Sequence, residues 1–80
     1  GSVSFNLSLE LMDQRFRKQI YTMEDEIRNT ITEQIEQMGW LELRTPEGKI
    51  MLKYDMLKRI NSMFPKPTVR NIYFTYFIMQ

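Results

Sequence analysis

The chain has no cysteine and no histidine, and these two absences exclude several kinds of chemistry. Without cysteine it cannot form a disulfide, and it lacks the strongest side-chain nucleophile for covalent catalysis. Without histidine it lacks the commonest general base and the commonest ligand for transition metals. An enzyme or a binder of small ligands is therefore the disfavoured interpretation, and no cofactor is expected.

Long apolar runs and an excess of one charge are also missing. No stretch approaches the ~18 apolar residues that a membrane-spanning helix needs. Eleven basic and ten acidic residues give a net charge of +1, which produces no overall field that would attract nucleic acid or an anionic membrane. We therefore expect no nucleic-acid partner.

The composition that remains is typical of one small globular domain. The apolar fraction is 42% and the charged fraction is 26%, and at 80 residues a single hydrophobic core is only marginally sufficient. Gly1 and Ser2 resemble the remnant of a removed purification tag, so we take residues 3–80 as the domain. The chain is expected to be a piece cut from a longer protein.

The two ends of the sequence are predicted to be β-strands. Apolar and polar residues alternate over 3–11, as in a strand with one buried face. Residues 69–80 are rich in β-branched and aromatic side chains, which favour strands. Strict period two places Ile72, Phe74, Tyr76 and Ile78 on one face and Tyr73, Thr75, Phe77 and Met79 on the other. Because both faces are apolar, this strand is either covered on two sides or carries a β-bulge.

The stretch from Asp13 to Gly39 is predicted to be helical. Asp13 is a capping residue, and Gly39 is placed to end the helix in a left-handed conformation. Thr22 and Asp25 have the spacing of a capping box, which favours a short helix, a bend near Thr22 and a longer helix. One continuous helix is the alternative. The apolar stripe consists of Phe16, Ile20, Met23, Ile27, Ile31, Ile35 and Met38.

A second helix is predicted after an apolar connection over 40–44, whose three large apolar side chains are expected to pack against the domain. Thr45 is the expected helix cap, with Pro46 at the first helical position. Leu52, Met56, Ile60 and Met63 mark the buried face.

Taken together, the elements predict an α+β fold. We expect a small antiparallel or mixed sheet with two to three helices packed on one face. Phe74 is expected to be almost fully buried against the second helix. The predicted core consists of Phe5, Leu7, Leu9, Ile27, Ile31, Leu52, Met56, Ile60, Ile72, Phe74 and Phe77.

Charge is distributed unevenly between the two helical stretches. The charged residues within 22–38 are mostly acidic, whereas those within 47–70 are mostly basic. One interpretation is that the two helices lie side by side and attract each other within the domain. The other is that the charges face outward and meet across neighbouring copies. The possible assembly surface then contains Glu24, Asp25, Glu33, Glu36, Lys49, Lys53 and Arg59.

Two blocks of the sequence are specific in order and spacing. The first is the ending Val69-x-x-Ile72-Tyr73-Phe74-Thr75-x-Phe77-x-x-Gln80. The second is Leu43-Arg44-Thr45-Pro46-Glu47-Gly48-Lys49, followed by Leu52, Ile60 and Asn61. Together they cover about half of the chain, and they resemble the FliL family of flagellar basal-body proteins. Tyr76 departs from the family, which often has an acidic residue at that position.

The resemblance implies a non-enzymatic domain of the SPFH/stomatin-like type. It further implies the periplasmic part of a membrane-anchored inner-membrane protein, which forms a homo-oligomer or ring around the flagellar stator and supports it. The alternative is a generic SPFH-type membrane scaffold with no flagellar role. The family also has an extended apolar segment before the first strand, so that strand is expected to lie at a sheet edge or to pair with another copy.

Overall fold

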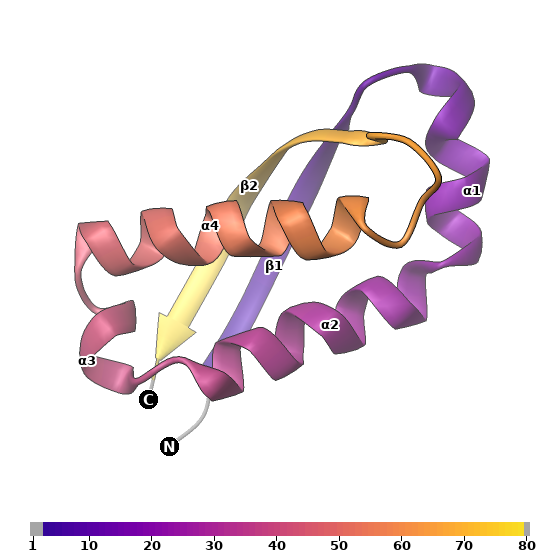
Figure 1. Cartoon of the computed structure of the whole chain (residues 1–80). Coiled ribbons are helices and arrows are strands. Elements are labelled where there is room, and N and C mark those ends of the chain that lie inside the picture. Colours follow the sequence, from indigo (N-terminus) through magenta and orange to yellow (C-terminus); the bar gives the residue numbers. More distant parts are fainter. Residues whose placement is uncertain (1–2, 80) are drawn as a thin grey trace.

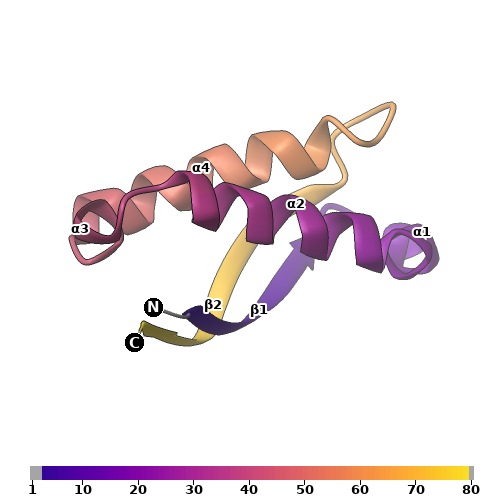
Figure 2. The same ribbon diagram turned by 90° about the horizontal axis from the view of Figure 1, so that it is seen from below.

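The structure, a computed structural model, describes residues 3–79. Two strands, β1 (Val3–Leu11) and β2 (Val69–Met79), form an antiparallel sheet. The elements between them are a 3-10 turn (Gln14–Phe16), α1 (Arg17–Thr22), α2 (Glu24–Gln37), α3 (Trp40–Leu43) and α4 (Pro46–Asn61). Figures 1 and 2 show these helices on one side of the sheet. The predicted α+β fold with an antiparallel sheet is confirmed.

Two irregularities in the strand pairing decide which β2 residues face the helices. Leu7 lies opposite Phe74, whereas Asn6 lies opposite Tyr76, so Thr75 is an extra residue in β2. A similar shift lies between Glu10 and Leu11. An extra residue reverses the alternation of side chains beyond it. Of the two alternatives given for this strand, coverage on both sides or a β-bulge, the bulge is therefore correct.

The bulge at Thr75 corrects the strict period-two assignment beyond Phe74. Tyr76 and Ile78, which that assignment placed with Phe74, are exposed. Phe77 instead joins the helix-facing side, where it packs against the core. The rings of Phe74 and Phe77 meet edge to face with centroids 5.5 Å apart, a favourable aromatic geometry.

The core lies between α2, α4 and the beginning of β2. Leu52, Met56 and Ile60 have no exposed surface, and Ile27, Ile31 and Ile72 are also buried. The other predicted core residues, Phe5, Leu7, Leu9, Phe74 and Phe77, pack against this cluster but are only partly buried. The expectation that Phe74 is almost fully buried is therefore wrong. The reason is that α4 crosses the strands obliquely (Figure 1), so it covers Val69 and Ile72 more completely than Phe74.

The predicted bend near Thr22 is present, because α1 ends at Thr22 and α2 begins at Glu24. The predicted capping box is wrong. The Thr22 hydroxyl donates to the Lys18 carbonyl at 3.0 Å, within its own helix, and no side chain caps α2 at Met23. Asp13 does act as a cap, for the short 3-10 turn, by accepting from the Arg15 amide at 2.8 Å.

The connection after α2 differs from its prediction in two ways. Gly39 is extended (φ −69°, ψ 147°) rather than left-handed, because Met38 already leaves the helix in an extended conformation. Residues 40–43 form the short helix α3, which buries Leu43 but leaves Leu41 exposed. The packing predicted for the Trp40 side chain lies outside the described side chains.

The beginning of α4 is a tight corner built by Thr45 and Gly48. The Thr45 hydroxyl accepts from the Gly48 amide and donates to the Glu42 carbonyl, each at 2.9 Å. Pro46 occupies the first helical position, where an amide hydrogen is not needed. A Cβ atom on Gly48 would overlap the Glu42 carbonyl oxygen. The Thr-Pro-Glu-Gly block therefore lets α4 turn back against α3.

The end of α4 is joined to β2 by the side chain of Asn61. Its Oδ1 accepts from the Thr68 and Val69 amides at 2.9 and 2.8 Å, and its Nδ2 donates to the Val69 carbonyl at 3.0 Å. Thr68 and Val69 are buried, so these backbone groups have little access to water. At the start of β2, the Asn61 side chain thus makes the backbone hydrogen bonds that a neighbouring strand would otherwise make.

Candidate functional site

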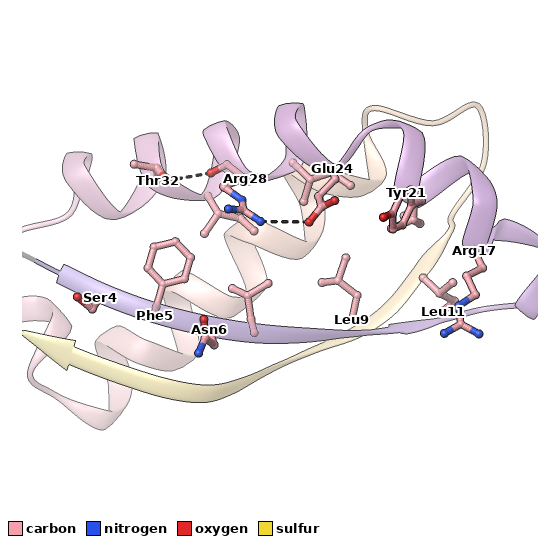
Figure 3. A pocket seen from close by; sticks show the side chains of 14 residues that line it. Ser4, Phe5, Asn6, Leu9, Leu11, Arg17, Tyr21, Glu24, Arg28 and Thr32 are labelled. Atoms are coloured by element: carbon pink, nitrogen blue, oxygen red, sulfur yellow. Dashed lines mark hydrogen bonds and ion pairs between the residues drawn. The ribbon is translucent and has the colours of Figure 1, made fainter.

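An open groove of about 880 Å³ lies between β1 and the helices α1 and α2 (Figure 3). Phe5 and Leu9 extend from the helix-facing side of β1 toward α2. The apolar lining consists of Phe5, Leu7, Leu9 and Leu11 from β1 and Ile20, Ile27 and Ile31 from the helices. The remaining lining residues are Ser4, Asn6, Arg17, Tyr21, Glu24, Arg28 and Thr32.

The groove exists because the helix layer is wider than the sheet. α4 packs on β2, and α2 packs beside α4. Packed helices lie about 8–10 Å apart, whereas neighbouring strands are separated by only about 4.8 Å. As a result α2 extends past β1 on the side away from β2 (Figure 1). The apolar residues of β1 are therefore left half-buried, under a helix that does not close on them.

The free edge of β1 runs along this groove. β1 pairs with β2 on one side, and within residues 3–79 no strand pairs with its other edge. β1 contains no proline and no glycine, and its one charged residue, Glu10, lies near its end. Proteins commonly protect free edges with prolines, bulges or inward-pointing charges. The edge and the apolar wall beside it together form a surface suited to an extended polypeptide segment.

The polar rim of the groove is exposed to solvent. The Arg28 guanidinium donates to Glu24 at 3.1 Å, and the Thr32 hydroxyl donates to the Arg28 carbonyl at 2.9 Å (Figure 3). Such an exposed pair on one helix stabilises by only about 0.3–0.5 kcal/mol. Arg17 lies at the end of the groove near Leu11. These groups can orient a bound segment, but they provide no nucleophile beside a general base.

The residues of the predicted assembly surface lie on α2 and α4, where they face different directions. Lys49 and Lys53 lie on the β2 side of α4, with their ammonium groups 5.9 and 5.1 Å from the ring centroids of Phe77 and Tyr73. Arg59 lies on the side facing α2, where its guanidinium donates to Gln37 Oε1 at 3.3 Å. On the acidic helix, Glu24 is on the groove rim, whereas the exposed Asp25, Glu33 and Glu36 are not among the lining residues.

Direct ion pairing does not hold the acidic and basic helices together. The two ion pairs among the described residues, Arg15–Asp13 and Arg28–Glu24, each lie within one local segment. α2 and α4 do lie side by side, but Arg59 on α4 donates to the uncharged amide oxygen of Gln37 on α2 and not to a carboxylate. Most of the charge on both helices therefore faces solvent.

Two kinds of feature are absent from residues 3–79. No three carboxylate, histidine or cysteine side chains come close enough together to hold a metal ion. None of the described helices combines the length and apolarity required to cross a membrane.

Comparison with known proteins identifies the family. The sequence model of the family described as "Flagellar basal body-associated protein FliL" matches residues 1–80. The chain belongs to the FliL family. A flagellar protein FliL of Aquifex aeolicus (strain VF5) is 40% identical over 75 residues, which make up 94% of this chain and 47% of that protein. The chain thus spans about half the length of this FliL relative.

Family membership confirms the resemblance inferred from the two sequence blocks. The chain is a FliL domain, and FliL proteins belong to the flagellar basal body. The groove was not predicted from the sequence. The alternating apolar residues of β1 were a signal for it, because they require a cover that α2 alone does not complete.

Proposed function

We propose that this FliL domain is a non-enzymatic accessory part of the flagellar motor that assembles around the stator units and supports them, which affects motility. The observation that carries the proposal is the FliL match over the whole chain, together with the 40% identity to a flagellar protein FliL. In this proposal the domain lies in the periplasm, and the full-length protein anchors it to the inner membrane. Its partners are further copies of itself and the stator proteins.

The surface that we assign to the stator contact is the groove beside β1. An extended segment with apolar residues at alternate positions would pair its backbone with the free edge of β1 and place its side chains beside the half-buried Leu7 and Leu9. Support of the stator requires that this contact be stronger in one stator conformation than in another. A segment that is extended only in the engaged stator would meet that requirement.

The experiment is site-specific crosslinking between this domain and periplasmic fragments of the stator. Because the chain has no cysteine, a single cysteine at Tyr21 on the groove rim reports on one position. We expect Tyr21→Cys to crosslink to a stator fragment, and Arg17→Glu in the same protein to reduce the yield. A cysteine at Leu41, which is exposed on α3 and not among the residues lining the groove, is the matched control.

Motility of a FliL-deletion strain provides the second readout. The full-length gene should restore swimming, and the same gene with both Arg17→Glu and Tyr21→Ser should restore it less. Equal crosslinking at Tyr21→Cys and Leu41→Cys would remove the groove from the proposal. Absence of any stator crosslink, together with normal swimming in the deletion strain, would contradict the stator role itself.

A further inference from the structure

A second surface of the domain, on α4, has large apolar side chains that the described residues leave exposed. Met51 and Tyr54 are 60% and 66% exposed, and Ile50 beside them is 55% exposed. Side chains three and four positions apart lie on one line of a helix, so Glu47, Met51, Tyr54 and Lys58 form one outward stripe. We call these four residues the α4 stripe. It lies on the face opposite Leu52, Met56 and Ile60, which are fully buried.

The order of residues in the stripe is self-complementary. It has an acid in the first turn of α4, two large apolar residues in the middle and a base in the last turn. If two such helices pack antiparallel with Met51 opposite the partner's Tyr54, the same alignment places Glu47 opposite the partner's Lys58. Both pairs are centred on the same point of the helix. One two-fold axis therefore satisfies the apolar contacts and the charges together.

We propose that the α4 stripe is a contact between two copies of this domain, whose α4 helices pack antiparallel about a two-fold axis. The occupant is a second copy because both halves of the required surface are present on the one helix. Opposite helix directions also bring the positive N-terminal end of each α4 near the negative C-terminal end of the other.

The expected dimer is weak and reversible. A helix of 16 residues is about 24 Å long at ~1.5 Å per residue, so one helix pair buries less than the ~800 Å² per partner of a standard stable interface. The α4 stripe includes none of the residues lining the groove, so the dimer leaves the groove free. The proposed dimer therefore does not depend on the proposed stator contact, and an experiment can contradict either one without affecting the other.

Sedimentation equilibrium over a concentration series tests the dimer. We expect a reversible monomer–dimer equilibrium in the unmodified chain and a dissociation constant raised roughly tenfold by Tyr54→Ser, since a central aromatic residue dominates a small contact. Tyr21→Ser removes a tyrosine from the groove rim that is 78% exposed, more than Tyr54, and is the matched control. It should leave the dissociation constant unchanged.

Charge reversal tests the alignment of the two helices. Glu47→Lys alone or Lys58→Glu alone should raise the dissociation constant about fivefold, because each breaks two exposed ion pairs in the dimer. The double variant exchanges the two charges and should return the constant to near its original value. Circular dichroism shows whether each variant keeps its helices.

A cysteine at Met51 tests the geometry directly. Because the chain has no other thiol, a short bismaleimide should join two copies of Met51→Cys and should not join two copies of Tyr21→Cys. A monomer at millimolar concentration, or a dimer unaffected by Tyr54→Ser, would overturn the proposal. Assembly beyond a dimer that Tyr54→Ser abolishes would also overturn it, since that result indicates insertion of the stripe into the groove of the next copy.

Discussion

Gly48 shows how one missing Cβ atom shapes this domain, because any side chain there would overlap the Glu42 carbonyl. We expect Gly48→Ala to lower the free energy of unfolding by about 1–3 kcal/mol, the usual cost of forcing extra atoms into a packed site. That loss outweighs the gain of up to ~1 kcal/mol from the higher helix propensity of alanine. Urea unfolding of the variant and the parent chain measures the difference.

Gly39 provides the matched control for this measurement. Its φ of −69° is accessible to alanine, and the nearest atom to an added Cβ is 4.0 Å away. Gly39→Ala should therefore leave stability unchanged or raise it by up to about 1 kcal/mol, by restricting the unfolded chain. Similar unfolding midpoints for the two alanine variants would show that the α3–α4 corner adjusts and that the close approach is unimportant.

Asn61 contributes through three hydrogen bonds to the backbone of Thr68 and Val69. Asn61→Ala leaves those partly buried groups unpaired, which should lower the free energy of unfolding by about 1–3 kcal/mol. Asn61→Asp keeps the acceptor for both amides and should cost less. Amide hydrogen exchange reads out the effect locally: protection of Thr68 and Val69 should fall in Asn61→Ala, and unchanged protection would contradict the role given to this side chain.

Asp13 gives the domain a small, localised dependence on acid. The side chain and the amide of Arg15 both donate to its carboxylate, and these bonds lower the pKa of Asp13 from 3.8 to about 2. The folded chain therefore favours the ionised form. The resulting stabilisation is present above pH 3.8 and is lost as the pH falls toward 2.

An NMR titration of the Asp13 carboxyl group checks this prediction. Arg15→Gln should return the pKa of Asp13 toward 3.8, because it removes the side-chain donor that has the largest effect. Arg17→Gln is the control. A titration midpoint of Asp13 near 3.8 in the parent chain would show that the Arg15 contact does not persist in solution.

Among the elements, β2 departs most from what its sequence pattern predicts. The bulge at Thr75 turns Phe77 toward the helices and Tyr76 toward solvent. Phe77→Ala should therefore destabilise by about 2 kcal/mol, less than the ~3–5 kcal/mol of a fully buried phenylalanine. Tyr76→Ala should cost under about 1 kcal/mol. If thermal unfolding shows the larger loss at Tyr76, the strand has no bulge and follows strict alternation.

The helices and strands could be predicted because their signals are local. The cap at Thr45 and the break after Thr22 each depend on a few adjacent residues, and apolar periodicity marks the buried faces of α2 and α4. The bulge, the oblique crossing that leaves Phe74 half-buried and the hydrogen bonds of Asn61 depend on contacts between distant segments. The periodicity of a sequence contains no information on such contacts, so these three features could not be predicted without the three-dimensional structure.

At the scale of the whole molecule, two helices side by side rest on a sheet of two strands. This difference in width produces the groove and leaves one edge of β1 free. The sequence did indicate that an edge of β1 could pair with another chain, because β1 has no proline, glycine or central charge. It could not indicate the groove, since that depends on the spacing between α2 and α4. The α4 stripe is a separate surface, so the two contacts that we propose do not overlap.

The pairing of β1 with β2 joins the first and last of the described elements, which lie side by side in Figure 1. During synthesis β1 leaves the ribosome before β2, and it remains unpaired until β2 follows. At ~5–20 residues per second this interval lasts several seconds, while the helices form in microseconds. Throughout that time the apolar residues of β1 are available to chaperones and to other nascent chains. Completion of the sheet is therefore expected to be the slow step of folding, and the newly made strand is the part that a holding chaperone would bind.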